Sequence, residues 1–102
     1  MFEKLALENL TFDSFHPYKG QKFSVENLSL PIGLHLMSAK ARKTSHPNET
    51  RIPFSLMFKS DQQHVLPQGS YCLANENFGT VEIFLVPVER DAEGVTYQAV
   101  FN

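Results

Sequence analysis

Histidine is the residue of this chain that most often binds metals, and four are present: His16, His35, His46 and His64. A metal pair on one strand or helix needs ligands two or four positions apart, whereas these residues are much farther apart in the sequence. A zinc site would need three separate segments to converge. The sequence therefore favours solvated or hydrogen-bonded histidines, and it predicts neither a metal site nor a cofactor.

Nucleophilic catalysis has few candidates in this sequence. Cys72 is the only cysteine, and no cationic residue stands beside it to favour the reactive thiolate. Ser55, Ser60 and Ser70 lack the G-x-S-x-G spacing that acyl transfer on an α/β sheet uses. An inert thiol and ordinary serines are the better interpretation, so the sequence predicts no catalytic residue and no enzyme.

A compact group of charges, Glu89, Arg90, Asp91 and Glu93, looks like a carboxylate pair beside a guanidinium. Acid–base catalysis needs two carboxyl groups in different environments within a cleft, whereas these residues fall in a predicted hairpin tip. We therefore expect turn geometry and an exposed ion pair worth at most about 1 kcal/mol.

Basic residues gather around the polar stretch Lys40–Thr50, which is predicted to be a loop. They are Lys40, Arg42, Lys43 and Arg51. An acidic partner or a phosphate would suit them, but no glycine-rich loop accompanies them. The whole chain has a formal net charge of −2, which disfavours nucleic-acid binding.

The rest of the composition fits a reducing compartment. A lone cysteine excludes internal disulfides. The segment Met1–Leu10 lacks the apolar core of a secretory signal, and no stretch approaches the roughly 20 apolar residues of a membrane span. The sequence therefore predicts a cytoplasmic protein with no membrane partner.

The chain has enough apolar material for one core. Its 102 residues include nine Phe and three Tyr, and 42% of the residues are hydrophobic. A chain of this length buries roughly 60 to 70% of its unfolded surface, and each large aromatic residue buries of order 150 to 250 Å². We expect a single β domain spanning residues 1–102.

Alternation of apolar and polar residues predicts an all-β domain of about six strands. We expect the strands to be mostly antiparallel and to form a small barrel or a tight sandwich, with one short helical turn near the N-terminus. The predicted strands are Lys22–Leu28, Ile32–Leu36, Arg51–Lys59, Tyr71–Leu73, Val81–Glu89 and Val95–Phe101.

The strand Arg51–Lys59 has the clearest alternation. Pro53 cannot donate a hydrogen bond to a neighbouring strand, so this strand either begins there or lies at an edge of the sheet. The side chains predicted to share its core face are Ile52, Phe54, Leu56 and Phe58.

The helical turn is predicted between Leu10 and Gly20. Pro17 is tolerated in the first turn of a helix, and Gly20 supplies a left-handed stop. Three aromatic residues at a spacing of three are expected to plug one end of the core: Phe12, Phe15 and Tyr18.

Prolines and glycines mark the connections in the second half of the chain. Leu66–Gly69 fits a type I turn, and Arg90–Gly94 fits a type I turn followed by a bulge with Gly94 in the left-handed α conformation. The strands on either side of Arg90–Gly94 are therefore expected to pair. Ile83–Val88 is apolar on both faces, which predicts a strand covered on both sides, and Pro87 predicts a bulge or corner in it.

Three segments carry a family resemblance: Phe54–Phe58, Leu66–Tyr71 and Phe84–Asn102. They are similar to the patterns FSL-x-F, LPQG-x-Y and FLVPV-x-RD-x-x-G-x-x-Y-x-A-V-F-N of a bacterial family of small uncharacterised domains. The opening pattern of that family, F-x-x-x-x-G-x-x-F, is matched by Phe15, Gly20 and Phe23.

The same resemblance says little about what the domain does. Glu89 stands where the family more often has glycine, within the predicted bulge. The resemblance implies no activity, cofactor or site residue. It implies only an association with phage-tail-like proteins.

The first functional hypothesis is a non-enzymatic interaction or structural module. Its polar loops, Lys40–Thr50 and Ser60–Leu66, would present a surface to another protein. An edge strand near Pro53 could also accept a strand from that partner. The partner would be a protein, and the resemblance points to a component of a phage-tail-like assembly.

The second hypothesis is a small ligand-binding barrel or minor enzyme. A cavity of about 300 Å³ or more with converging polar groups would favour it, whereas a filled core would favour the interaction module. The residues that would line such an internal pocket are Tyr71, Tyr97, His35 and Cys72.

Overall fold

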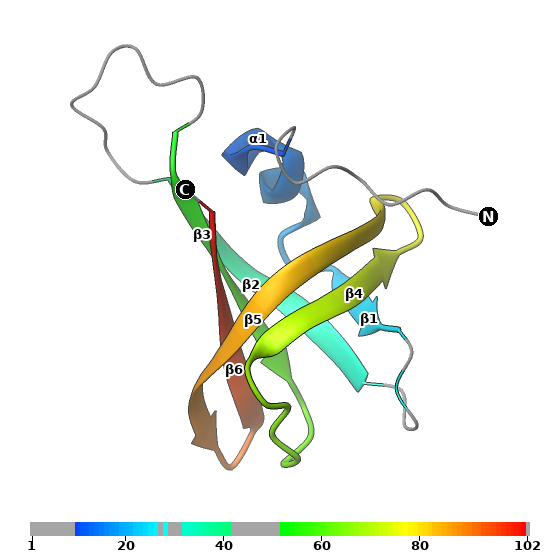
Figure 1. The fold of residues 1–102 in the computed structure, drawn as a ribbon, viewed down its shortest axis with the longest axis vertical. Coiled ribbons are helices and arrows are strands. Elements are labelled where there is room, and N and C mark those ends of the chain that lie inside the picture. The colour runs from blue at the N-terminus through cyan, green and yellow to red at the C-terminus, as the bar shows by residue number, and fades with distance from the viewer. Residues whose placement is uncertain (1–9, 27, 29–31, 42–51, 102) are drawn as a thin grey trace.

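The computed structural model describes residues 10–26, 28, 32–41 and 52–101 (Figure 1). In these ranges a short helix, α1 (Phe12–Phe15), continues into a 3-10 helix, η2 (His16–Tyr18), and six strands follow. The strands are β1 (Lys22–Val25), β2 (Ile32–Ala41), β3 (Phe54–Ser60), β4 (Gly69–Asn75), β5 (Gly79–Asp91) and β6 (Gly94–Phe101). The predicted all-β fold with one helical turn near the N-terminus is confirmed.

The six strands close into a barrel in the order β1-β2-β3-β6-β5-β4, and the neighbouring strands are antiparallel. Two long strands change neighbours along their length. β5 pairs with β4 from Gly79 to Leu85 and with β6 from Val86 to Asp91, while β2 pairs first with β1 and then with β3. These changes of partner bend the sheet into a closed ring, so the structure is a barrel and not a sandwich.

The inward-facing side chains of the strands form one apolar core. Phe23 of β1 meets Phe58 of β3 edge-on, with ring centroids 5.8 Å apart. Phe54 and Phe101 stack with their centroids 4.5 Å apart and their planes within 5°. Aliphatic residues fill the space between these rings, and those with almost no exposed surface include Leu34, Leu36, Leu56, Leu73 and Ile83.

The helices α1 and η2 lie over one open end of the barrel (Figure 1). Phe15 is fully buried, and its ring contacts those of Phe54, Phe78 and Phe101 at centroid separations of 5.9, 4.8 and 5.6 Å. Gly20 ends the segment with φ of +88°, the predicted left-handed stop. Neither helix of this described segment is long and apolar enough to cross a membrane. The predicted plug is confirmed, since two further aromatic residues pack against the core: Phe12 and Tyr18.

Strand β3 begins at Phe54, directly after Pro53, as one of the two predicted alternatives requires. The other alternative, an edge strand, is wrong because β3 pairs with β2 on one side and with β6 on the other. Ile52 was also predicted on the core face, but it is 51% exposed because it precedes the paired part of the strand. Leu56 and Phe58 are buried as predicted.

The first two strands differ in length from the prediction. β1 ends at Val25, earlier than expected, and β2 continues to Ala41. A bulge between Leu36 and Ser38 leaves Met37 without a direct cross-strand partner. A bulge shifts the alternation of side chains by one residue, so the apolar pattern stops at Leu36 although the strand does not.

Strand β5 contains the bulge predicted at Pro87, between that residue and Glu89. The prediction that both faces of this strand are covered is wrong. Phe84 is 52% exposed and Val88 is 48% exposed, while Ile83 is buried in the core. The outer apolar side chains of β5 therefore lie on the surface of the barrel.

The hairpin between β5 and β6 confirms that these strands are adjacent and antiparallel. The Oδ1 atom of Asp91 accepts hydrogen bonds from the backbone N–H groups of Glu93 at 2.8 Å and Gly94 at 3.2 Å. Gly94 has a positive φ, as predicted, but its value of +142° lies far from the left-handed α value of about +57°. The predicted left-handed α conformation is therefore wrong.

The entry to β4 also differs from the prediction. Instead of a type I turn over Leu66–Gly69, the chain bends at Gln68, and Gly69 is already the first residue of β4. Leu73 points into the core as expected. Tyr71 is half-buried against the core, and its hydroxyl donates a hydrogen bond to the carbonyl oxygen of Pro67 at 2.5 Å.

Candidate functional site

The histidines do not converge in the described part of the chain. His16, His35 and His64 are exposed and lie in η2, in β2 and in the loop between β3 and β4. His46 lies outside the described residues. Among the residues that the structure describes, no three His, Cys, Asp or Glu side chains come together in a group that could hold a metal ion.

The candidate nucleophiles are also separate. Cys72 is half-buried on β4, and its direct partner on β5 is Glu82, so a carboxylate and not a cation lies opposite the thiol. Ser60 is buried, and its hydroxyl donates a hydrogen bond to the carbonyl oxygen of Gln62 at 3.2 Å. The two remaining serines lie on other parts of the barrel surface. Ser55 is half-buried, and Ser70 is exposed.

The hairpin carries the exposed ion pair that was expected there, but Asp91 pairs with Lys59 of β3, a partner that the sequence does not indicate. The Nζ atom of Lys59, on β3, lies 2.9 Å from Oδ2 and 3.1 Å from Oδ1 of Asp91. The hydrogen bond from Lys59 lowers the pKa of the Asp91 carboxyl, with help from the backbone N–H of Glu93. The same hydrogen bond raises the pKa of Lys59. The ion pair thus joins β3 to the β5–β6 hairpin.

The loop between β3 and β4 is fastened to the same hairpin. The Nε2 atom of Gln63 donates hydrogen bonds to the carbonyl oxygens of Asp91 at 2.9 Å and Ala92 at 3.4 Å. The backbone N–H of Leu66 donates to the hydroxyl of Tyr97 at 2.9 Å. Both loops lie at the same end of the barrel, opposite α1 (Figure 1). We refer to residues 61–66 and 88–94 as the hairpin end.

Tyr97 supplies a buried hydrogen-bond acceptor in this region. Its burial raises the pKa of its hydroxyl, although the hydrogen bond from Leu66 acts in the opposite direction. The side chain is 1% exposed, and Leu66 is 4% exposed. The role of Tyr97 is therefore structural: its ring belongs to the core and its hydroxyl satisfies a loop amide.

We expect Tyr97→Phe to lower the free energy of unfolding by about 1 to 3 kcal/mol, because the buried N–H of Leu66 then has no acceptor. Urea titration of the two proteins measures this loss. Tyr71→Phe is the matched control, since the hydroxyl of Tyr71 is exposed at its bond to Pro67, and it should cost less than half as much. Equal losses of unfolding free energy in the two variants would show that the hydrogen bond from Leu66 to Tyr97 stabilises the fold no more than the exposed bond from Tyr71 to Pro67.

The four residues proposed to line an internal pocket do not face one space. Tyr97 is buried and bonded to the loop, and Tyr71 is bonded to Pro67. His35 lines a different hollow of about 260 Å³, on the outside of the barrel, together with Asp61. Cys72 lies on β4 beside the outward-facing Glu82. The structure therefore does not assemble the predicted pocket.

A hollow of about 300 Å³ lies instead on the outer surface of β2, β3 and β6. We call it the groove. Lys40 lies in β2 and not in the predicted loop, and among the described residues it is the basic one that lines the groove. The other basic residues proposed around that loop, Arg42, Lys43 and Arg51, lie outside the described residues. The walls of the groove are mainly apolar: Ala41, Pro53, Phe54, Val100 and Phe101.

Comparisons with known proteins identify the family of the chain. A search of curated proteins and a search of solved structures each find no match to it. A scan against protein-family models matches residues 10–101 to the family described as "Domain of unknown function (DUF6916)". The match includes all six strands of the barrel and the helices that plug it. The chain therefore belongs to the family of small uncharacterised domains described as DUF6916.

Proposed function

We propose that this domain is a non-enzymatic interaction module that binds another protein through its hairpin end. The observation that carries the proposal is the fixed position of the loop 61–66, which Gln63 and Tyr97 bond to the rest of the barrel. A loop that is ordered before binding loses little conformational entropy when a partner arrives. Binding residues commonly lie on such loops, held by a rigid scaffold.

The surface of the hairpin end has the composition of a small recognition site. Val65 and Val88 are 36% and 48% exposed, so apolar side chains are available for contact. The same end also carries exposed charged side chains, including Arg90 and Glu93. Interfaces between proteins that also exist separately combine apolar and charged side chains in this way.

The identity of the partner is suggested by the sequence resemblance alone. The resemblance implies an association with phage-tail-like proteins, and on that ground we propose a component of such an assembly as the partner. The lone Cys72 suits a cytoplasmic location for this contact. Neither nucleic acid nor a membrane is part of the proposal.

The alternative is a ligand-binding barrel or a minor enzyme, which needs an internal cavity of about 300 Å³ or more. Two findings favour the interaction module. The inward-facing rings of Phe15, Phe23 and Phe58 occupy the core, and all three are fully buried. The hollows described above lie on the outside of the barrel, where His35 and Lys40 are exposed.

The test is an affinity pull-down from the native host with the tagged full chain, read by mass spectrometry. We expect a partner protein whose recovery falls at least about tenfold with Val65→Asp, because a charge is then placed in an apolar contact. Met37→Asp is the matched control, since Met37 is 52% exposed on β2, away from the hairpin end. Recovery of the same proteins with both variants would contradict the proposal.

A further inference from the structure

The two parts of the hairpin end are joined by a chain of contacts that starts at the Asp91 carboxylate. Its Oδ1 atom accepts hydrogen bonds from the backbone N–H groups of Glu93 and Gly94, and these bonds fix the shape of the hairpin tip. Both of its oxygen atoms also accept hydrogen bonds from Lys59 of β3, at 3.1 and 2.9 Å. One carboxylate therefore shapes the tip and holds it against β3.

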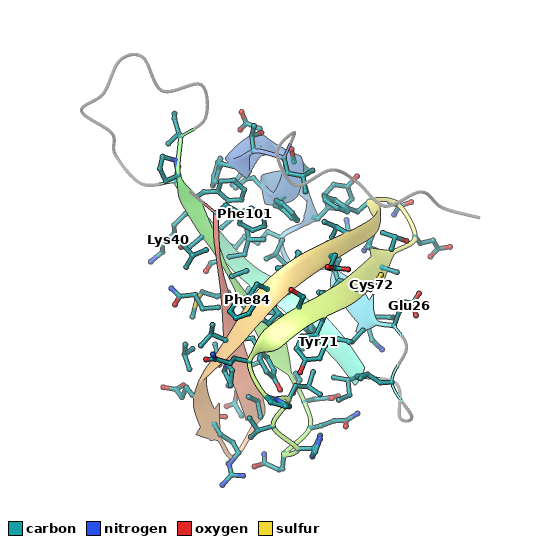
Figure 2. All side chains as sticks on the ribbon, viewed as in Figure 1. Glu26, Lys40, Tyr71, Cys72, Phe84 and Phe101 are labelled. Atoms are coloured by element: carbon teal, nitrogen blue, oxygen red, sulfur yellow. The ribbon has the colours of Figure 1, made fainter. Side chains whose placement is uncertain are left out.

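The loop 61–66 is bonded to this tip through one side chain. The amide group of Gln63 donates hydrogen bonds to the carbonyl oxygens of Asp91 and Ala92, which belong to neighbouring peptide groups of the tip. Figure 2 shows the hairpin and the loop together at the end of the barrel away from Phe101. Because the two carbonyl groups keep their positions only while the tip keeps its shape, a change at Asp91 reaches the loop through Gln63.

The ends of the loop are anchored in the barrel independently of Gln63. Ser60 is 1% exposed, and its carbonyl oxygen lies where a Cβ atom on Gly94 would stand. Leu66 is 4% exposed, and its backbone N–H is bonded to a hydroxyl of the core. Between these two anchors, residues 61–65 are exposed except for the half-buried Gln62. This part of the loop is therefore held by its bonds to the hairpin and not by burial in the core.

We propose that residues 61–65 and 91–93 form a latch, which opens and closes as one unit while the barrel stays folded. The hydrogen bonds from Gln63 and Lys59 hold the closed state, and Asp91 is the residue on which both depend. Neither segment contributes a buried side chain. Segments with few buried contacts open at a lower cost in free energy than the core of a protein.

The latch has a consequence for binding that rests on the proposed function of the hairpin end. Its closed state holds the exposed side chain of Val65 in one position. A partner that needs this position binds more weakly in proportion to the fraction of molecules whose latch is open. The latch itself is a property of the free domain and is measured without a partner, so either proposal can fail while the other stands.

Hydrogen exchange of the backbone amides of the full chain, followed by NMR, tests this inference. Asp91→Asn keeps the size of the side chain but removes the charge that binds Lys59, and Gln63→Ala removes the link to the loop. We expect each variant to raise the exchange rates of the Gln62 and Glu93 amides by at least about threefold. Each substitution thus loosens the segment that it does not belong to.

Two amides and one variant serve as controls. The amide of Leu66, which is bonded to Tyr97, and the amide of Leu56, in the middle of β3, lie outside the latch. Both should exchange in the variants as they do in the parent protein. Asp13→Asn makes the same chemical change on α1, at the other end of the barrel, and should alter the exchange of neither segment of the latch.

The double variant tests whether Asp91 and Gln63 act within one unit. If they do, Asp91→Asn combined with Gln63→Ala should raise the exchange rates about as much as the stronger single variant, because the latch is already open. Unchanged exchange, faster exchange confined to the substituted segment, or single effects that multiply in the double variant would overturn the inference. An equal rise at Leu56 would also overturn it, since the two segments would then open only when the whole barrel unfolds.

Discussion

Gly94→Ala and Gly94→Val are expected to lower the free energy of unfolding by about 4 kcal/mol or more, enough to leave much of the protein unfolded. A Cβ atom on Gly94 would overlap the backbone carbonyl oxygen of Ser60, at the end of β3. Its φ of +142° is itself unfavourable for any residue with a side chain. Backbone atoms cannot move aside as the end of a flexible side chain can, so the contact between the β5–β6 hairpin and β3 would be lost.

Gly79→Ala separates the two causes. Gly79 also has a positive φ, +105°, but apart from its chain neighbours no atom of the residues that the structure describes lies within 4 Å of the position of its Cβ. Its substitution should cost only about 1 to 2 kcal/mol, from backbone conformation alone. Thermal and urea unfolding of the variants compares them. A loss for Gly94→Ala no larger than that for Gly79→Ala would contradict the close approach of the hairpin to Ser60.

Phe54→Ala and Phe58→Ala should each cost roughly 3 to 5 kcal/mol, because each truncation removes a fully packed ring and leaves a cavity. Phe54 is 2% exposed and stacks on Phe101, and Phe58 is fully buried against Phe23. Denaturant titration measures both losses. A loss below about 1 kcal/mol at both positions would place this face of β3 in solvent.

Met37→Ala is the control for these truncations. Met37 is a large apolar residue at the bulge of β2, but it is 52% exposed. Its removal should change the free energy of unfolding by no more than about 0.5 kcal/mol. A loss as large as that of Phe54→Ala would show that the outer face of β2 is covered in solution.

The core of this barrel could be predicted from the sequence where alternation is uninterrupted. Phe54, Leu56 and Phe58 follow a period of two, and all three are buried. The prediction failed where geometry changes the phase or the length of a strand. The bulge at Met37 interrupts the alternation, so the second half of β2 was not predicted. Ile52 fits the alternation, but it precedes the paired residues of β3 and is therefore not in the core.

Contacts between distant segments could not be predicted from local patterns. The ion pair between Lys59 and Asp91 joins residues 32 positions apart, and the bond between Leu66 and Tyr97 joins residues 31 positions apart. Both depend on the closure of the barrel. The sequence shows that both faces of β5 are apolar, and from this we predicted that both are buried. That prediction was wrong for Phe84, which lies on the outer surface.

For the candidate site, the sequence mainly indicated which kinds of site are unfavourable. Spacing alone argued against a cluster of histidines or a serine nucleophile, and the structure keeps His16, His35 and His64 on separate elements. The groove could not be foreseen, because Pro53 and Val100 meet only through the pairing of β3 with β6. A hollow formed by the pairing of distant strands leaves no local motif.

Crystallography of the full chain, purified from its native host, tests whether the interior of the barrel is filled by its own side chains and therefore has no room for a ligand. We expect electron density inside the barrel to belong only to its own side chains, with the rings of Phe15, Phe23 and Phe58 packed as described here. Density for a metal ion or a metabolite among those rings would contradict a filled core and would favour the ligand-binding alternative.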